Sequence, residues 1–365
     1  MFHVDKENQE KMRVNKFISQ LFMLLIISTT ILTACGPRYK SELNVIGFQK
    51  DWCNYGEILS AFSDKYDVKI NELNADAGSG DRIDAIKATM DTKRSQAPDV
   101  VEVSFSFGEP NKDLFMPYKV STWSTIPDTM KNADGYWYGD YYGVMAFLVN
   151  TRVQPSLPRD WADLLDPKYA GQVALSGDPR ISNQAIQAVQ AAAHANSGSL
   201  DDAQAGLEFF AQLNRVGNLV PVASNNELVA RGETPVRITW DYNALTAMDA
   251  FAGNPSAEMV IPKTGQLAGL NVQAISAYAP HPETAKLWME FLYSDEGQLL
   301  RMKGYCHPTR EFDLRARGIV PPDLAAKLPD TSSAVFPSLG QFNSARGLIT
   351  VGWDAAVGAD VKAAP

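Results

Sequence analysis

The stretch Tyr142-Gly-Val-Met-Ala-Phe-Leu-Val-Asn150 decides the fold. It is too apolar for a surface loop, so it predicts a buried strand. It ends in Asn150-Thr-Arg152, and Pro155 and Pro158 follow before the segment that begins at Trp161. A buried strand that runs out into such a linker indicates a boundary between two folded parts of the chain.

Upstream of this stretch, segments with the pattern of strands alternate with segments that have the apolar spacing of helices. We expect strands at residues 43–48, 68–73 and 99–103, and helices at 55–65 and 81–92. This alternation predicts a mostly parallel sheet that is covered by helices on both faces.

The same alternation continues downstream. The expected strands are 172–175, 236–240, 258–262 and 270–276, and the expected helices are 183–195, 202–213, 226–231 and 282–291. We therefore predict an α/β protein with two lobes, between which the chain crosses more than once.

The composition is that of an ordinary globular protein. The chain has 365 residues, of which 45% are hydrophobic, and its formal net charge is -9. This length leaves room for about two domains of typical size. Nucleic-acid partners usually require a basic stripe, which this acidic chain does not show, so we expect no nucleic-acid binding.

The N-terminus carries the features of an export signal. A basic segment precedes an apolar run over residues 17–32, and Leu32-Thr-Ala-Cys35 follows at once. The run is shorter than the roughly 20 residues of a membrane-spanning helix. Small residues before an obligatory cysteine resemble a bacterial lipobox, so we expect residues 1–34 to be removed and Cys35 to be lipidated. The protein would then be anchored in the cell envelope, in the periplasm or on the outer face of the membrane. Translation would start at either Met1 or Met12.

Sequence motifs for catalysis and for metal binding do not occur. The chain has no Gly-x-Ser-x-Gly turn, no His-Glu-x-x-His, no Cys-x-x-Cys and no Walker-type loop. Among its four histidines, only His307, within Gly304-Tyr-Cys-His-Pro308, has a setting of chemical interest. We therefore expect no enzyme, no metal site and no cofactor. An anchored hydrolase that uses His307, or an envelope lipoprotein that binds cell-wall partners, are the alternatives.

Aromatic and polar residues follow several of the predicted strands. Asp51-Trp52 follows the first strand, Ser104-Phe-Ser-Phe107 follows the third, and Trp240-Asp-Tyr242 follows a strand of the second lobe; Gly135 to Gly143, rich in tyrosine, precedes the crossover. Ligands of open α/β sheets bind outside the carboxyl ends of the strands. Since loops rarely carry this much aromatic surface without packing on something, we predict an aromatic cleft between the lobes.

Two further cysteines, Cys53 and Cys306, remain after lipidation. An even number of thiols in an exported chain permits one disulfide, and two buried free thiols fit the sequence equally well.

Six motifs spread along the chain form a recognisable set. They are the lipobox, Asp51-Trp52, Ala97-Pro-Asp-Val100, the crossover 142–150, Trp161-Ala-Asp-Leu-Leu-Asp-Pro-Lys-Tyr-Ala-Gly171 and Glu290-Phe-Leu-Tyr-Ser-Asp-Glu-Gly-Gln298. Together they resemble the extracellular solute-binding proteins of ABC importers, most of all the branch that binds ferric iron, polyamines, thiamine and phosphonates. The resemblance implies two α/β lobes of the periplasmic-binding-protein kind, with crossover hinge strands and a ligand cleft between them. Such a protein closes around a small solute and hands it to a membrane permease and its ATPase.

The resemblance also implies how the chain is divided. The N-terminal lobe would hold residues 35–145 plus 262–312, and the C-terminal lobe 146–261 plus 313–365, in a monomer. In a fold of this family, the segment after Gly297-Gln298 returns toward the first strand, which would bring Cys306 to Cys53.

Relatives whose ligands are known suggest different ligands for the predicted cleft. Ferric-binding relatives use an adjacent tyrosine pair in the second lobe, but the pair Tyr141-Tyr142 precedes the crossover, so we do not carry the iron role over. Polyamine-binding relatives sandwich their ligand between aromatic and acidic residues. The corresponding loops here hold Trp52, Ser104, Trp240, Asp241 and Tyr242.

Phosphate- and phosphonate-binding relatives use a serine where a helix of the second lobe begins. Ser182 and Asn183 match that position, with Arg180 adding charge, although a simple helix cap explains Ser182 equally well. The acidic groups favour an organic cation such as putrescine or spermidine, with an organophosphate or phosphonate as the main rival.

Overall fold

The computed structural model describes residues 39–90 and 95–364. The expected signal at residues 1–34 and the lipidation site Cys35 lie outside the described residues. Within the described part, no helix combines the length and the apolar character needed to cross a membrane.

Three parallel strands form the first part of the sheet. They are β1 (Ser41–Ile46), β2 (Val68–Glu72) and β3 (Val100–Ser104), and β1 pairs in parallel with both of the others. The helices α2 (Tyr55–Tyr66) and α3 (Ser79–Lys87) connect them in turn. This alternation of strands and helices is the one that the sequence predicts.

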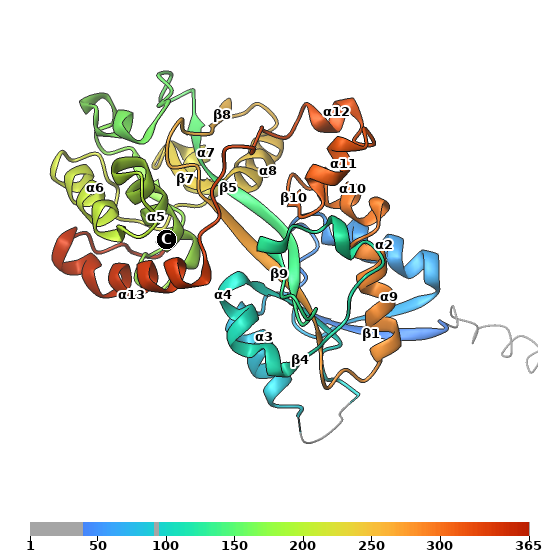
Figure 1. Ribbon diagram of the computed structural model, residues 1–365. Coiled ribbons are helices and arrows are strands. Elements are labelled where there is room, and N and C mark those ends of the chain that lie inside the picture. Colours follow the sequence, from blue (N-terminus) through green and yellow to red (C-terminus); the bar gives the residue numbers. More distant parts are fainter. Residues whose placement is uncertain (1–38, 91–94, 365) are drawn as a thin grey trace, which may run out of the picture.

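Two long strands join the two halves of the molecule. Strands β5 (Tyr138–Asn150) and β9 (Ala268–Ser276) pair antiparallel and run between two groups of helices (Figure 1). Because β9 also pairs with β3, and β5 with β7 (Val236–Trp240), a single sheet runs in the order β2-β1-β3-β9-β5-β7-β6. Every residue of β5 is buried, as its apolar sequence predicts. The sheet is mixed rather than mostly parallel, because both crossover strands are antiparallel to their neighbours.

The second half repeats the layered arrangement. Strand β6 (Val173–Leu175) pairs in parallel with β7, and β8 (Ala257–Val260) pairs antiparallel with β5. Helix α5 (Asn183–Ser197) packs on α6 (Ala203–Arg215), and α13 (Leu339–Ala356) packs on both. The alanines of α5 and a glycine on α6 let the two helices approach closely.

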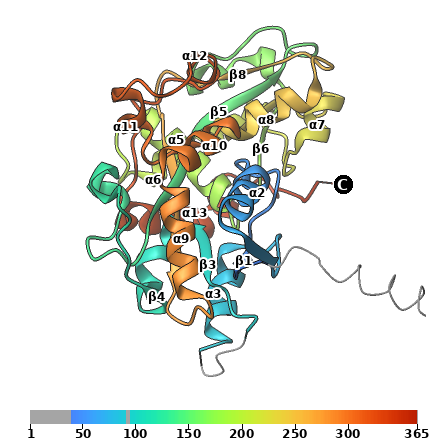
Figure 2. The same ribbon diagram turned by 90° about the vertical axis from the view of Figure 1, so that its right-hand side faces the viewer.

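The remaining elements are short or cover the edges. Strand β4 (Phe115–Met116) pairs with β9, and β10 (His307–Pro308) pairs with β5. The other α-helices are α4 (Phe105–Gly108), α7 (Asn226–Arg231), α8 (Asp241–Phe251), α9 (Pro282–Leu292), α10 (Asp295–Lys303), α11 (Glu311–Ala316) and α12 (Pro322–Ala325). Turns of 3-10 helix occupy Glu109–Leu114, Trp123–Thr125, Asp128–Met130, Trp161–Leu165 and Pro167–Tyr169. Helices α2 and α9 lie beside each other near β1 (Figure 2).

Helix α8 differs from the expectation. The sequence places Asp241 and Tyr242 in a loop after a strand, whereas the structure begins α8 at Asp241 directly after β7. The two side chains are therefore held by a helix.

Two large hydrophobic clusters fill the interior. The first extends from Leu43 of β1 to Leu300 of α10, and the second includes Trp161, Phe210 and Trp353. Strand β5 contributes residues to both clusters, whereas the buried apolar residues of β9 belong to the first cluster alone, so β5 joins the two cores.

The lobe boundaries remain a proposal, with one change at the C-terminal end. Leu314 of α11 and Leu324 of α12 pack against Met302 of α10, not against the second cluster. This packing disagrees with an assignment of residues 313–365 as a whole to the C-terminal lobe. We propose that the last crossing lies between α12 and α13.

Candidate functional site

A groove opens where the loop after β1 faces the elements of the second half. Its cavity volume is about 510 Å³, and we call it the polar cleft. Its lining residues are Gln49, Asp51, Trp52, Cys53, Gln184, Asn225, Asn226, Glu227, Arg237, Tyr242, Asn243 and Thr246. Both sides of the crossover strands therefore contribute to one groove.

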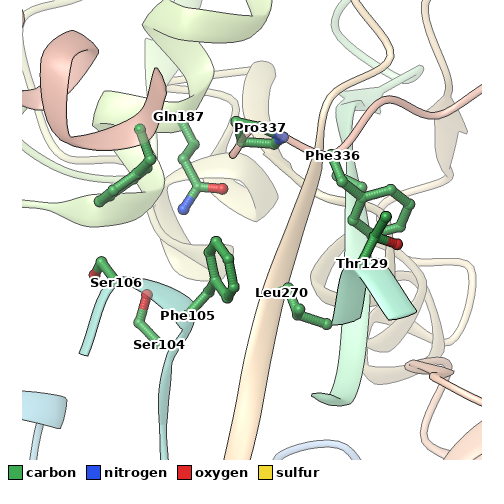
Figure 3. Close-up of a pocket in the computed structure, with 10 residues that line it drawn as sticks. Ser104, Phe105, Ser106, Thr129, Gln187, Leu270, Phe336 and Pro337 are labelled. Atoms are coloured by element: carbon green, nitrogen blue, oxygen red, sulfur yellow. The ribbon is translucent and has the colours of Figure 1, made fainter. Parts of the chain in front are cut away.

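A much smaller pocket, with a cavity volume of about 20 Å³, lies at the end of β3, and we call it the apolar pocket. Figure 3 shows Phe105 pointing from the end of β3 toward Gln187 of α5. The lining residues are Ser104, Phe105, Ser106, Thr129, Gln187, Ala268, Leu270, Phe336, Pro337 and Phe342. Since Gln184 lines the polar cleft and Gln187 follows it by about one helical turn, the first turns of α5 border both spaces.

Three aromatic rings connect the two halves beside the polar cleft. The Nε1–H of Trp52 donates a hydrogen bond to the hydroxyl of Tyr141 at 2.6 Å. The Trp52 and Tyr242 rings meet edge to face, with centroids 5.4 Å apart. Trp240, in contrast, is only 7% exposed and packs over Gly269. Trp52 and Tyr242 thus lie at the cleft as predicted, whereas Trp240 is buried behind the residues that line it.

Asp241 does not reach the cleft. Its side chain is fully buried, and one carboxylate oxygen accepts hydrogen bonds from the backbone N–H groups of Val144 and Tyr242. The other oxygen lies 2.9 Å from Nε2 of His307. All of these partners belong to the protein, so the structure contradicts the prediction that Asp241 pairs with a cationic ligand.

His307 lies between two carboxylates. Its Nδ1 is 2.6 Å from Oε2 of Glu311, and its ring stacks on that of Tyr142. Burial lowers the pKa of His307, but the hydrogen bonds and charges of Asp241 and Glu311 outweigh burial and raise the pKa to about 9. At neutral pH the ring is therefore an imidazolium that donates through both nitrogens. It has no free lone pair with which to activate a nucleophile, so the geometry gives no support to a hydrolase.

The predicted anion-binding group at the start of α5 is occupied by the protein itself. Ser182 Oγ accepts the backbone N–H of Ala185, which is the helix-cap alternative. Arg180 forms ion pairs with Asp178, Asp354 and Asp360. These three carboxylates neutralise Arg180, and it lines neither the polar cleft nor the apolar pocket. Ser182 and Asn183 are also absent from both linings.

The structure brings four of the predicted contacts to the two spaces. Asp51, Trp52 and Tyr242 line the polar cleft, and Ser104 lines the apolar pocket.

Sequence reasoning missed Gln184, Asn226 and Arg237 in the polar cleft. A signal existed for Arg237, because it is the only charged residue in the otherwise uncharged strand Val236–Trp240. A charged residue in a buried strand needs a polar or oppositely charged partner, so such a residue indicates a possible ligand-binding site.

A disulfide fixes the loop that carries Trp52. Cys53 and Cys306 are bonded, with their Cα atoms 5.4 Å apart. Cys53 and Asn54 both have positive φ angles, of 48° and 62°. This left-handed backbone costs roughly 1 to 2 kcal/mol for each residue with a side chain, so the loop needs anchors. The disulfide supplies one of them.

The second anchor is a buried ion pair beneath the same loop. Arg301 Nη2 donates to both oxygens of Asp140, at 2.9 and 3.0 Å, and Arg301 Nη1 donates to the carbonyl of Cys53. Both charged side chains are fully buried. Tyr55 and Gln273 donate further hydrogen bonds to Asp140. This cluster connects the Trp52 loop to β5, β9 and α10.

Metal binding finds no support in residues 39–90 and 95–364. No group of three or more histidine, cysteine, aspartate or glutamate side chains is arranged there to hold a metal ion.

The chain is similar to known proteins over most of its length. Residues 96–342 match the family model of bacterial extracellular solute-binding proteins. Iron uptake protein A1 of Synechocystis sp. is 21% identical over 81% of this chain and 88% of its own. The spermidine/putrescine-binding periplasmic protein of Escherichia coli is 28% identical over 57% of this chain and 60% of its own.

A solved structure shares the fold. The periplasmic binding protein AfuA of Actinobacillus pleuropneumoniae, with fructose-6-phosphate bound, superposes with a TM-score of 0.65. It is 22% identical, and the match covers 87% of this chain and 99% of that protein. This likeness confirms the predicted periplasmic-binding-protein architecture.

Proposed function

The chain belongs to the family of bacterial extracellular solute-binding proteins, and from that premise we propose that it captures a small solute in the polar cleft. Proteins of this family serve ABC importers, to whose permeases they deliver the bound solute, and they carry the solute without transforming it. The chain is therefore a substrate-binding protein for ABC import and not an enzyme, as the sequence predicts.

One observation supports the polar cleft as the binding site. Its lining comes from both ends of the crossover strands, with Trp52 on one side and Gln184, Arg237 and Asn243 on the other. A solute that touches both sides favours the closed arrangement over the open one, because only closure lets it make both sets of contacts.

The identity of the solute follows less directly. The acidic groups of the predicted site favour an organic cation, but one of them, Asp241, is paired with His307. A carboxylate that remains at the polar cleft is Asp51, which is exposed. The preference for putrescine or spermidine therefore loses its main residue, and the charge of the solute is argued separately below.

The proposed function predicts that Trp52→Ala weakens solute binding at least tenfold, because the indole is a central aromatic contact of the cleft. A thermal-shift screen of polyamines, sugar phosphates, phosphonates, thiamine and ferric salts would identify a solute, and calorimetry would measure its affinity for both proteins. Tyr39→Ala is the control, since Tyr39 is exposed and precedes β1, far from the loop that follows that strand. Equal affinities of wild type and Trp52→Ala would contradict binding in the polar cleft.

We further propose that a lipid on Cys35 holds the protein at the membrane, close to its permease. The motif Leu32-Thr-Ala-Cys35 supports this proposal, since the cysteine thiol is the acceptor of the lipid. Cys35→Ser is expected to leave the protein unprocessed or soluble, as measured by fractionation and by intact mass. Normal processing together with full membrane retention of the variant would overturn it.

A further inference from the structure

Arg237 is a cation without an anion. It lies in β7 between the buried residues Val236 and Ile238, and its guanidinium faces the polar cleft. Its Nε donates to Ser176 Oγ at 2.8 Å, and its Nη1 donates to Asn226 Oδ1 at 2.7 Å. Both acceptors are neutral. Among residues 39–90 and 95–364, no carboxylate lies within ion-pair distance of this side chain.

The surroundings of Arg237 leave its charge uncompensated. Burial lowers the pKa of Arg237 to about 10, so the group is still protonated at neutral pH. Arg237 is half-buried, and even partial removal of a guanidinium from water is unfavourable unless an opposite charge offsets the lost hydration. Two neutral acceptors repay only part of it. The side chain is therefore best stabilised when an anion enters the cleft.

The other charged groups of the cleft do not satisfy Arg237. Glu227 lines the same cleft, but its carboxylate pairs with Arg231 on the outer face of α7. Asp51 comes from the loop after β1, on the opposite side of the groove, and forms no ion pair within the described residues.

The neighbouring amides can assist an anion. Because Asn226 accepts from Arg237 through Oδ1, its amide N–H₂ remains free to donate. Asn243 lines the same side of the cleft. Amide donors grouped around a guanidinium are the usual surroundings of a bound carboxylate or phosphoryl group.

Resting on the proposed function, we propose that Arg237 binds an oxyanion group of the solute, either a carboxylate or a phosphoryl group. The solute is then an anion or a zwitterion, and a polyamine is excluded as its main ligand. The bidentate fork of the guanidinium selects planar or tetrahedral oxyanions by geometry as well as by charge.

Calorimetry with five probes tests this inference. The probes are fructose 6-phosphate, 2-aminoethylphosphonate, inorganic phosphate, citrate and putrescine. We expect at least one of the four oxyanions to bind the wild type, and Arg237→Gln to weaken that binding ten- to a hundredfold. Arg237→Lys keeps the charge but loses the fork, so it should fall between the two. Arg317→Gln, which removes an exposed arginine already paired with Asp295 and Asp313 outside the polar cleft, is the matched control and should stay within twofold.

Several outcomes would overturn the inference. They are binding of putrescine alone, absence of binding by all four oxyanions, or equal affinity of an oxyanion for wild type and Arg237→Gln. Binding of putrescine that depends on Trp52 would reject the anionic solute while leaving capture in the polar cleft intact. If Arg237→Gln does not fold, Arg237→Lys takes its place in the test. An affinity of Arg237→Lys for the oxyanions equal to that of the wild type would contradict bidentate binding by the guanidinium.

Discussion

Replacing Arg301 by methionine is expected to destabilise the protein by about 3 to 5 kcal/mol, because the change leaves Asp140 charged and buried without its cation. Both side chains are fully buried, and the guanidinium also lies 4.1 Å above the centroid of the Tyr55 ring. The variant loses this cation–π contact and the hydrogen bond to the carbonyl of Cys53 as well. Urea unfolding of wild type and Arg301→Met, followed by circular dichroism, measures the difference in the free energy of unfolding.

Arg317 supplies the matched control for this experiment. Its guanidinium pairs with Asp295 and Asp313, but 41% of the side chain is exposed. Arg317→Met is therefore expected to cost less than about 1 kcal/mol. In the double variant Asp140→Asn with Arg301→Met neither charge of this pair remains, so part of the lost stability should return. A loss below about 1 kcal/mol for Arg301→Met would contradict the role given to the buried pair.

Removing the disulfide is expected to cost about 5.5 kcal/mol in the chain-entropy model, because Cys53 and Cys306 are 253 residues apart. The double variant Cys53→Ala with Cys306→Ala should unfold at a lower urea concentration than the oxidised wild type. The loop that carries Trp52 also loses one of its two anchors, so the affinity for the solute should fall together with stability.

Intact-mass measurement with alkylation, with and without reductant, establishes the bond in the exported protein. The double variant also serves as the control for other effects of the reductant. The reductant should lower the stability of the wild type and leave that of the variant unchanged. Two alkylated thiols in the unreduced wild type would reject the bond.

Elements whose pattern is local were predicted well from the sequence. The expected bounds of α7 and β7 coincide with the observed ones, because a capping asparagine with a following glycine marks the helix and an apolar run marks the strand. The buried crossover β5 could also be recognised, since its short continuous apolar run is typical of a buried strand.

The chemistry of the cleft could be predicted only in part. Asp241 follows a buried strand, as ligand contacts often do, but its partner His307 is 66 residues away in the chain, so no local pattern shows that its charge is already paired. The ion pairs of Arg180 could not be predicted for the same reason, because two of its three carboxylate partners lie near the C-terminus of the chain. Arg237 shows the opposite case, a charge whose lack of a partner is visible only after folding.

The first hydrophobic cluster contains residues from Leu43 through Leu300, and this affects how the protein folds during its synthesis and export. As the chain emerges from the ribosome or from the export channel, β3 has no neighbour on one edge until β9 has followed. Trp288 and Phe291, which pack on Phe62 of α2, arrive later still. The N-terminal half therefore cannot close its core while it is being made, and its open strand edge is exposed to aggregation during that interval.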